Sequence, residues 1–533
     1  MKAIKWVCCV LLTGTLSATG SDPASAVEKL SRNEMAAVIE FLSHDLLEGR
    51  APGTRGGDLA ETYLAGLFKF MGLQPGADQG GYFQAFNMSA YRCLALEGSL
   101  AGKNLVFRED FIGHATMPER EFSISGPLVF SGFGIRAPRW DWDDYSEADV
   151  RDKVLIVRVN DPGLVHPEIF EGRILTYFGR WVYKLEEAAR LGARAVLLVH
   201  TDESAGYDWN VVLNSWSGES LLLENSPLKK LQFMGWIREK SLRQALDALD
   251  IDLDELYRRS ETPGFRAESL GTDIDISGSQ DLRQVTARNV IGVLPGRSEE
   301  TIVLSAHIDH FGPAGPEAGG GYFNGAIDNA SAVAAMTLVA KVLLETGYRS
   351  HHTLLFLACQ AEESGLLGSY HFVEQADRAK LIANLNFEST PVWEPSLDFF
   401  GVGARFSSLE ESLKKVLDSE NLDYSQFSME DRGFFYRSDQ FSFARFGIPA
   451  VWLSAGEKSV SGRNHIFEFF TGPYHTVRDE FDPEWELEGL RQTIKVTVGL
   501  IETLNREKRP PQWKDNLTFP LEERICKQNT EKK

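Results

Sequence analysis

Short apolar runs alternate with amphipathic helical segments from about residue 289 to 505, and this alternation constrains the fold more than any other feature. Short apolar runs bounded by turn residues are typical of buried strands, whereas apolar residues repeating every three or four positions are typical of helices. Such alternation predicts an α/β domain with a mixed, mostly parallel sheet flanked by helices. The expected strands are residues 301–306, 353–358, 381–387 and 449–453. One helix is expected to begin after a cap at Ser331, and another to span residues 484–504.

Two further segments precede this region. Residues 27–118 contain two amphipathic helical patterns separated by a glycine-rich turn, and we assign them to the same domain. Residues 119–285 differ, because short β-branched runs bounded by Gly, Pro and Asp predict a β-rich unit. We therefore expect a sheet domain built from residues 27–118 and 286–507, with residues 119–285 inserted into it. Residues 508–533 are expected to form a polar C-terminal tail.

The charge balance limits the partners of the chain. The 533 residues carry a formal net charge of −21, with 76 acidic against 55 basic side chains. Binding to nucleic acid or to anionic lipid depends on surplus Lys and Arg, so neither is an expected partner. An acidic surface also indicates that strongly acidic peptides are disfavoured as ligands. Five cysteines in a chain of this length exclude a disulfide scaffold.

The N-terminus has the layout of a secretory signal peptide. Lys2 and Lys5 precede a short apolar run, and Ala24-Ser25-Ala26 offers a processing site with cleavage after Ala26. The apolar run is shorter than the roughly 20 residues that span a bilayer, and no later uncharged segment reaches that length. We therefore expect residues 1–26 to be a signal peptide and the mature protein to be periplasmic or secreted, without membrane insertion.

Acidic and imidazole side chains stand just after the expected strands and at the start of the helix near Ser331. Taken singly, each has an ordinary explanation, such as a helix cap, a solvated carboxylate pair or a surface histidine. Loops at the carboxyl ends of parallel strands converge, so we expect these side chains to meet. Together they offer the nitrogen and oxygen ligands that zinc takes. The candidates are His307, Asp309, His310, Asp328, Glu362, Glu363, Glu388 and His475.

The candidate residues lie in short motifs that follow one another in a fixed order. The motifs are His-x-Asp from His307, Gly-Ala-x-Asp-Asn-Ala-Ser from Gly325, Glu-Glu-x-Gly from Glu362, Asn-x-acid from Asn386, Tyr-His-Thr-x-x-Asp from Tyr474, and a lead-in from Leu46 to Arg50. Their order resembles that of the M28 family of zinc peptidases, which includes bacterial aminopeptidases and glutamate carboxypeptidase-like enzymes. The resemblance implies a zinc exopeptidase fold, and the inserted segment is similar to a protease-associated domain.

This resemblance implies a pair of zinc ions in each chain. Asp328 would bridge both ions. His307 and Glu388 would complete one site, and Glu363 and His475 the other.

The same resemblance implies the catalytic roles. Glu362 would be the general base that takes a proton from the metal-activated water. Asp309 would orient an imidazole ligand, a role that zinc-binding histidines usually need filled. Tyr474 would stabilise the developing oxyanion. His310 is expected to support the site rather than to bind metal.

One position departs from the family pattern. The family usually has Asp where Glu388 stands. A competing register, Asn384-Leu385-Asn386, would place a neutral amide there and weaken one metal site. We favour Glu388 because a charged oxygen binds a divalent cation better than an amide does.

The sequence leaves the choice of peptide end open. An aminopeptidase that releases N-terminal residues is favoured over a carboxypeptidase on family frequency alone. No Gly-x-Ser-x-Gly elbow and no His-Glu-x-x-His helix occurs in the chain, so serine and thermolysin-like chemistry have no support. A non-catalytic binding protein on the same fold stays an alternative, which zinc content would distinguish.

Overall fold

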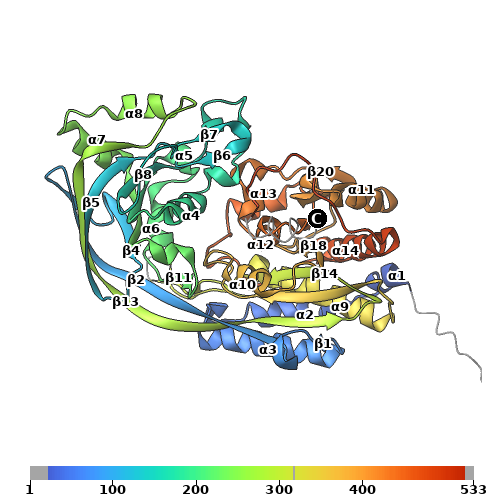
Figure 1. Cartoon of the computed structure of the whole chain (residues 1–533). Helices are drawn as coiled ribbons and strands as arrows, with labels where there is room; N and C mark the ends of the chain where they lie inside the picture. The colour runs from blue at the N-terminus through green and yellow to red at the C-terminus, as the bar shows by residue number, and fades with distance from the viewer. Residues whose placement is uncertain (1–21, 316–318, 522–533) are drawn as a thin grey trace, which may run out of the picture.

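The computed structural model describes residues 22–315 and 319–521, which form two lobes (Figure 1). The main lobe contains residues 22–82 and 295–521, and the inserted lobe contains residues 101–267. Two long antiparallel strands, β2 (Phe83–Leu100) and β13 (Glu268–Leu294), run between the lobes along one side of the molecule.

The main lobe has the mixed, mostly parallel sheet that the sequence predicts. Its strand order is β20-β19-β21-β18-β14-β17-β13, and the central strands β21, β18, β14 and β17 are all parallel. The antiparallel strands β13 and β19 flank this parallel group. The strands are β14 (Ser298–His307), β17 (His352–Cys359), β18 (Leu381–Asn386), β19 (Asp398–Val402), β20 (Asp423–Ser425) and β21 (Ala450–Ala455), with β1 (Gln74–Pro75) beside β13 and a small hairpin of β15 (Gly312–Pro313) and β16 (Tyr322–Phe323).

Helices cover both faces of this sheet. Successive residues of a strand point to opposite faces, so Ile302 and Leu304 of β14 belong to one apolar cluster and Val303 to the other. The helices packed on the first face are α1 (Pro23–Val27), α2 (Arg32–Leu42), α3 (Arg55–Met71), α9 (Ala332–Glu345), α11 (Leu409–Glu420) and α14 (Glu488–Glu507). The helices of the second cluster are α10 (Leu367–Gln375), α12 (Gln440–Arg445) and α13 (His465–Phe470).

Helix α9 lies in the centre of the first cluster. The stretch Ala326–Glu345 is long and apolar enough to cross a membrane, but 89% of it is buried inside the protein, as expected of a core helix. Each fully buried Val, Leu or Met of such a helix contributes about 1.5–3 kcal/mol relative to an exposed one. Ser331 does not cap α9 as expected, because its hydroxyl donates to the carbonyl of Ile327 one turn earlier.

The inserted lobe extends the same sheet. Its strands β5, β8, β10 and β12 are parallel, and β13 pairs with β5 at one end of this group. The strands are β3 (Lys103–Val106), β4 (Phe111–Ala115), β5 (Glu121–Phe130), β6 (Arg136–Ala137), β7 (Trp142–Asp143), β8 (Val154–Arg158), β9 (Phe170–Arg173), β10 (Ala195–His200), β11 (Ser220–Leu223) and β12 (Phe233–Arg238). The helices are α4 (Trp181–Leu191), α5 (Asp202–Ala205), α6 (Trp209–Trp216), α7 (Glu239–Asp247) and α8 (Leu253–Ser260).

Two expected boundaries differ from the structure. The insertion was expected to start at residue 119, but β4 already pairs with β12 of the inserted lobe, so this lobe begins earlier. The segment expected to be a polar tail is, in its described part at residues 508–521, packed against the main lobe. The indole of Trp513 donates to the carbonyl of Gly447 at 2.8 Å, and Phe519 is 5% exposed. Apolar side chains within a polar sequence hold this segment in place.

The signal-peptide prediction lies mostly outside the described residues. Residues 1–21 are not described, and Ala26, the expected cleavage site, lies within α1. The export of the chain therefore stays a prediction.

Candidate metal centre

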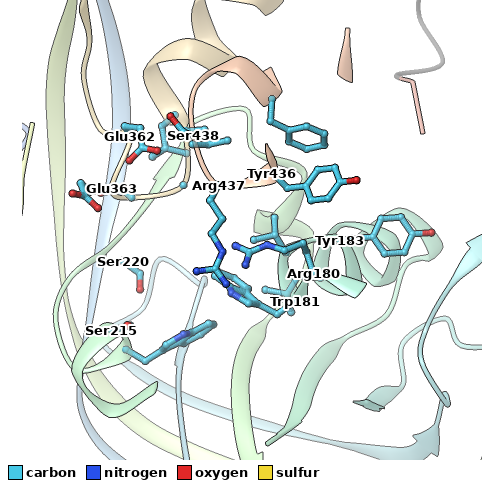
Figure 2. Close-up of a pocket in the computed structure, with 18 of the residues that line it drawn as sticks. Arg180, Trp181, Tyr183, Ser215, Ser220, Glu362, Glu363, Tyr436, Arg437 and Ser438 are labelled. Atoms are coloured by element: carbon cyan, nitrogen blue, oxygen red, sulfur yellow. The ribbon is translucent and has the colours of Figure 1, made fainter. Parts of the chain in front are cut away.

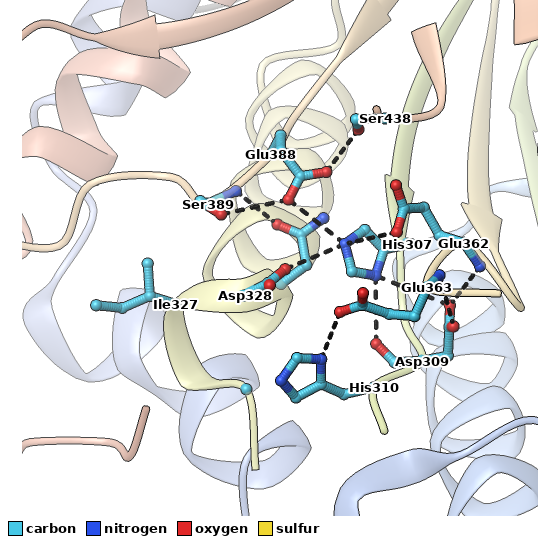
Figure 3. A network of polar contacts seen from close by, with 12 residues as sticks. His307, Asp309, His310, Ile327, Asp328, Glu362, Glu363, Glu388, Ser389 and Ser438 are labelled. Carbon is cyan, nitrogen blue, oxygen red and sulfur yellow. Dashed lines mark hydrogen bonds and ion pairs between the residues drawn. The ribbon is translucent and has the colours of Figure 1, made fainter. Parts of the chain in front are cut away.

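The carboxyl ends of neighbouring parallel strands bring the candidate residues together. His307 ends β14, Glu362 and Glu363 follow β17, and Glu388 follows β18. Asp328 lies in the turn Ala326–Ser331 that leads into α9, at the same edge of the sheet. Figure 3 shows these side chains pointing toward one common point.

Asp328 presents one oxygen to each of two donor groups. Its Oδ1 lies 3.3 Å from Nε2 of His307, which is also 3.4 Å from Oε1 of Glu388. Its Oδ2 lies 3.2 Å from Nε2 of His475, which is also 3.4 Å from Oε2 of Glu363. The five side chains expected to bind metal are therefore arranged as two sets of three donors that share Asp328.

These donor atoms have the spacing that a pair of cations requires. Zinc–nitrogen and zinc–oxygen bonds of about 2.0–2.1 Å at tetrahedral angles separate neighbouring ligand atoms by about 3.3–3.4 Å. The contacts to His307 and His475 match this spacing. Oδ2 of Asp328 is buried and accepts no hydrogen bond, so it keeps a free lone pair directed into the site. The residues present thus fit two divalent cations.

The charge balance of the site also favours cations. Burial raises the pKa of Glu362 well above its ordinary value, and although His307 opposes this, Glu363 and Glu388 raise it further. Burial likewise raises the pKa of Glu363 to about 8, with His475 opposing. Crowded carboxylates lose their charge unless positive groups hold them ionised, and metal ions supply that charge.

Glu362 lies next to the first donor set, with a carboxylate oxygen within 4.8 Å of ligand atoms of His307 and Glu388. Its Oε2 lies 3.9 Å from Nε2 of His307, and the residue is 7% exposed. The carboxylate of Asp309 accepts from the backbone N–H groups of Glu362 and Glu363 at 3.1 and 3.3 Å. Asp309 therefore holds the turn that carries both glutamates.

The contact between Asp309 and His307 differs in detail from expectation. Nδ1 of His307 is 3.2 Å from the backbone carbonyl of Asp309 and 3.8 Å from its carboxylate. The imidazole is thus oriented by the main chain, and the carboxylate lies slightly farther away. His310, expected to support the site, places Nδ1 2.6 Å from Oε1 of Glu363. Burial lowers the pKa of His310 to about 4, so it is neutral at pH 7.

The structure places Glu388, and not Asn386, at the candidate centre. Glu388 Oε2 accepts from the hydroxyl of Ser438 at 2.6 Å, while its Oε1 faces His307. The buried amide of Asn386 is engaged elsewhere, with Ser438 and Gln440 as acceptors at 2.9 and 2.8 Å. The register Asn386-Phe387-Glu388 therefore describes the geometry.

Tyr474 lies next to the second donor set. Its ring stacks on that of His475 with centroids 3.7 Å apart. Burial, together with the nearby Asp328 and Glu363, raises the pKa of Tyr474 well above its ordinary value. The hydroxyl therefore stays protonated and can donate a hydrogen bond.

Asp479 supports the site, although sequence reasoning gave it no role. Its Oδ1 and Oδ2 accept from the backbone N–H groups of Ile327 and Asp328 at 2.8 and 2.9 Å. It thereby fixes the turn that aims Asp328. The signal was present in the sequence, because Asp479 ends the motif that begins at Tyr474.

Arg50 is a second supporting residue without an assigned role. Its guanidinium is completely buried and donates to the backbone carbonyls of Leu42, Ile308, Asn324 and Gly325. Two of these carbonyls belong to the segment before Asp328 and one follows His307. Arg50 therefore ties the N-terminal segment to the loops that carry the donors.

The centre opens into a large cleft between the lobes. The cavity has a volume of about 3030 Å³ and is lined by residues of both lobes (Figure 2). Ligand pockets usually measure about 300–1,000 Å³, so this cleft can hold an extended chain of several residues.

Comparison with known proteins agrees with this geometry. Residues 289–498, which contain all the donor side chains, match the sequence model of Peptidase family M28. Aminopeptidase YwaD of Bacillus subtilis is 23% identical over 438 residues, which cover 79% of this chain and 76% of that protein. A glutamate carboxypeptidase 2 homolog of Caenorhabditis elegans is 34% identical over 119 residues, which cover 21% of this chain and 14% of that protein.

A solved structure shares the fold. The aminopeptidase from Aneurinibacillus sp. strain AM-1 superposes with a TM-score of 0.52 at 17% identity, over 94% of this chain and 99% of that one. The fold, the family match over residues 289–498 and the ordered donor motifs agree with one another. Residues 289–498 are therefore similar to peptidase family M28 in sequence and in the order of their donor motifs.

Proposed function

We propose that this protein is an exported exopeptidase that binds two zinc ions and releases N-terminal residues from peptides. The match of residues 289–498 to a peptidase family supports hydrolysis of peptide bonds as the reaction. The observation that carries the finer proposal is the carboxylate of Asp328, whose two oxygens each face a separate imidazole–carboxylate pair. The relative that matches most of the chain is an aminopeptidase, which supports the choice of the N-terminal end.

Five side chains would hold the metal pair. His307 and Glu388 would bind one ion, His475 and Glu363 the other, and Asp328 both. A bound pair would polarise the scissile carbonyl and increase the acidity of the attacking water.

The remaining residues would act on protons and charge. Glu362 would accept the proton of the attacking water and deliver it to the leaving amine, since its carboxylate lies beside the donor sets at the edge of the cleft. Tyr474 would donate its hydroxyl to the developing oxyanion. Asp309 would keep Glu362 in place through the backbone hydrogen bond described above.

Export and the nature of the inserted lobe belong to the same proposal. Cleavage after Ala26 would release a periplasmic or secreted enzyme. The inserted lobe would be a protease-associated domain whose surface forms one wall of the cleft. Carboxypeptidase action is a second candidate, because the side chains of Arg180 and Arg437 line the same cleft and could bind the C-terminal carboxylate of a peptide.

Metal content and peptide hydrolysis test this function together. We expect two zinc ions per chain in the mature protein and in Glu362→Gln, with hydrolysis of Leu-p-nitroanilide abolished only in the variant. Glu203→Gln is the matched control, because Glu203 lines the cleft but lies exposed in the inserted lobe.

Other results would change the proposal in defined ways. Cleavage of an amino-blocked peptide alone would establish a carboxypeptidase. Absence of both zinc and hydrolysis would refute the enzyme and leave a binding protein on this fold.

A further inference from the structure

Two arginine side chains enter the cleft from opposite lobes. Arg180 precedes helix α4 of the inserted lobe, and Arg437 lies in the main lobe just before Ser438. Figure 2 shows the two guanidinium groups beside one another in the cavity, with Glu362 and Glu363 to one side. Each lobe thus contributes one positive charge to the same place.

Neither guanidinium has an acidic partner. Within residues 22–315 and 319–521, no carboxylate oxygen lies within 4.0 Å of either group, and Nε of Arg437 is buried without a hydrogen bond. Another arginine of the same cleft shows the usual arrangement, since Arg445 pairs with Glu186 at 3.0 Å. Arg180 and Arg437 are partly buried and yet lack such a partner.

Holding these two charges together without a counter-charge is unfavourable. Burial and the neighbouring Arg437 lower the pKa of Arg180 to about 9, and burial also lowers the pKa of Arg437. Arg180 is nevertheless cationic at pH 7. The side chains that favour the charged forms most are the hydroxyl groups of Tyr207 and Tyr474, which carry no charge at that pH. An anion that entered the cleft would remove this repulsion.

The arginine pair lies close to the candidate centre. Tyr474, which stacks on His475, lies near enough to both arginines to interact with them electrostatically, and it raises the pKa of each. Ser438, the residue after Arg437, donates to Glu388. A group bound by the pair would therefore belong to a substrate whose scissile bond lies at the metal donors.

We propose that Arg180 and Arg437 together bind a carboxylate of the substrate, so that the enzyme prefers short peptides with a free carboxyl group near the scissile bond. The inference rests on the proposed peptidase function. A carboxylate is planar and offers two oxygens to the forked donors of a guanidinium, which makes it the matching group on a peptide. The carboxylate is either the C-terminal one of a di- or tripeptide or the side chain of Asp or Glu. The overall acidity of the chain thus does not extend to this part of the cleft.

Matched acid and amide substrates test the proposal. The measured quantity is kcat/KM for Leu-Ala, Leu-Ala-amide and Leu-Asp-amide, and for acetyl-Leu-Ala with its amide. We expect a peptide with a free carboxyl group to be cleaved about 10- to 100-fold better than the matching uncharged amide, since hydrogen bonds to charged groups have that strength. Preference for Leu-Ala identifies the C-terminal carboxylate, and preference for Leu-Asp-amide identifies the side chain.

Variants assign this preference to the arginines. Arg180→Gln and Arg437→Gln should each reduce the acid-to-amide ratio toward one, whereas Arg180→Lys should retain part of it because the charge remains. Arg432→Gln is the matched control, since Arg432 also lines the cleft but lies exposed. Equal rates for acids and amides in the wild-type protein, or a ratio unchanged in both Gln variants, would overturn the proposal.

A binding measurement separates this inference from the proposed function. Calorimetric titration of metal-loaded Glu362→Gln with acetyl-Leu-Ala and with its amide needs no turnover. Tighter binding of the acid that disappears on Arg437→Gln would support the arginine site even if no peptide were hydrolysed. Equal binding of acid and amide would refute the site while leaving peptidase activity untouched.

Discussion

The buried Arg50 gives the sharpest test of how the site is held together. Its guanidinium spreads over four backbone carbonyls from separate segments, and the side chain is completely buried. Burial lowers the pKa of Arg50 to about 10, and the surrounding acids, foremost Asp309 and Asp479, oppose this. Arg50→Lys keeps the charge but replaces a planar fork by a single nitrogen.

The magnitude follows from the number of carbonyls lost. An ammonium group at one point cannot reach acceptors on all sides of the former guanidinium plane, so we expect about two carbonyls to lose their partner. Each buried unsatisfied polar group costs about 1–3 kcal/mol, which gives about 2–6 kcal/mol in total. A loss of about 4 kcal/mol lowers the melting temperature by roughly 7 °C for a lobe of this size.

Scanning calorimetry of the metal-free protein measures this effect without a contribution from bound zinc. Arg55→Lys is the matched control, because Arg55 is 77% exposed in the same segment and lies 4.0 Å from Glu48. The control should melt within about 1 °C of the wild type, as surface substitutions usually do. If Arg50→Lys behaved like this control, the carbonyls would not depend on the guanidinium and the reasoning would be refuted.

Three further substitutions test other supports of the structure. Asp479→Asn should weaken zinc binding about 10- to 100-fold, because one backbone N–H of the Asp328 turn would lose its acceptor; chelator competition measures this, and unchanged affinity would contradict it. Ser438→Ala should release one zinc before the other in the same titration, since Glu388 is the one donor side chain of the five that loses a hydrogen bond; simultaneous release as in the wild type would speak against it. Phe519→Ala should cost about 3 kcal/mol and speed proteolysis of the C-terminal segment; an unchanged cleavage rate would show that this segment is not anchored there.

Local patterns predicted the centre of the main sheet well. Strands β14, β17, β18 and β21 are buried on both faces, so they appear in the sequence as continuous apolar runs. Strand β13 was not predicted, because its first half is half-exposed and contains residues such as Asp273 and Asp275. Pairing with β2 and β5, which lie far away in the sequence, stabilises these residues as a strand. The early start of the inserted lobe was also missed because it depends on a distant pairing, that of β4 with β12.

The residues of the candidate site also fall into those that the sequence predicts and those that it does not. Residues whose side chains face the centre could be predicted, because their chemical types and their places after strands are visible in the sequence. Arg50 and Asp479 bind backbone atoms of other segments. Both stand at the ends of motifs visible in the sequence, but the motifs do not show which backbone atoms these side chains contact. Arg180 and Arg437 were missed because an arginine without an acidic partner is recognisable only when its surroundings are known.

A carboxylate site divided between two lobes requires that the lobes keep a fixed relative position. Strand β13 provides this, because it pairs with β5 of the inserted lobe along one part and with β17 of the main lobe along another. Between these parts β13 stays paired with β2, so a continuous two-stranded ladder rather than a loop joins the lobes. The ion pair between Glu186 and Arg445 adds a second connection close to the cleft. The inserted lobe can therefore take part in substrate selection without moving, and peptides would be selected by the position of their carboxylate.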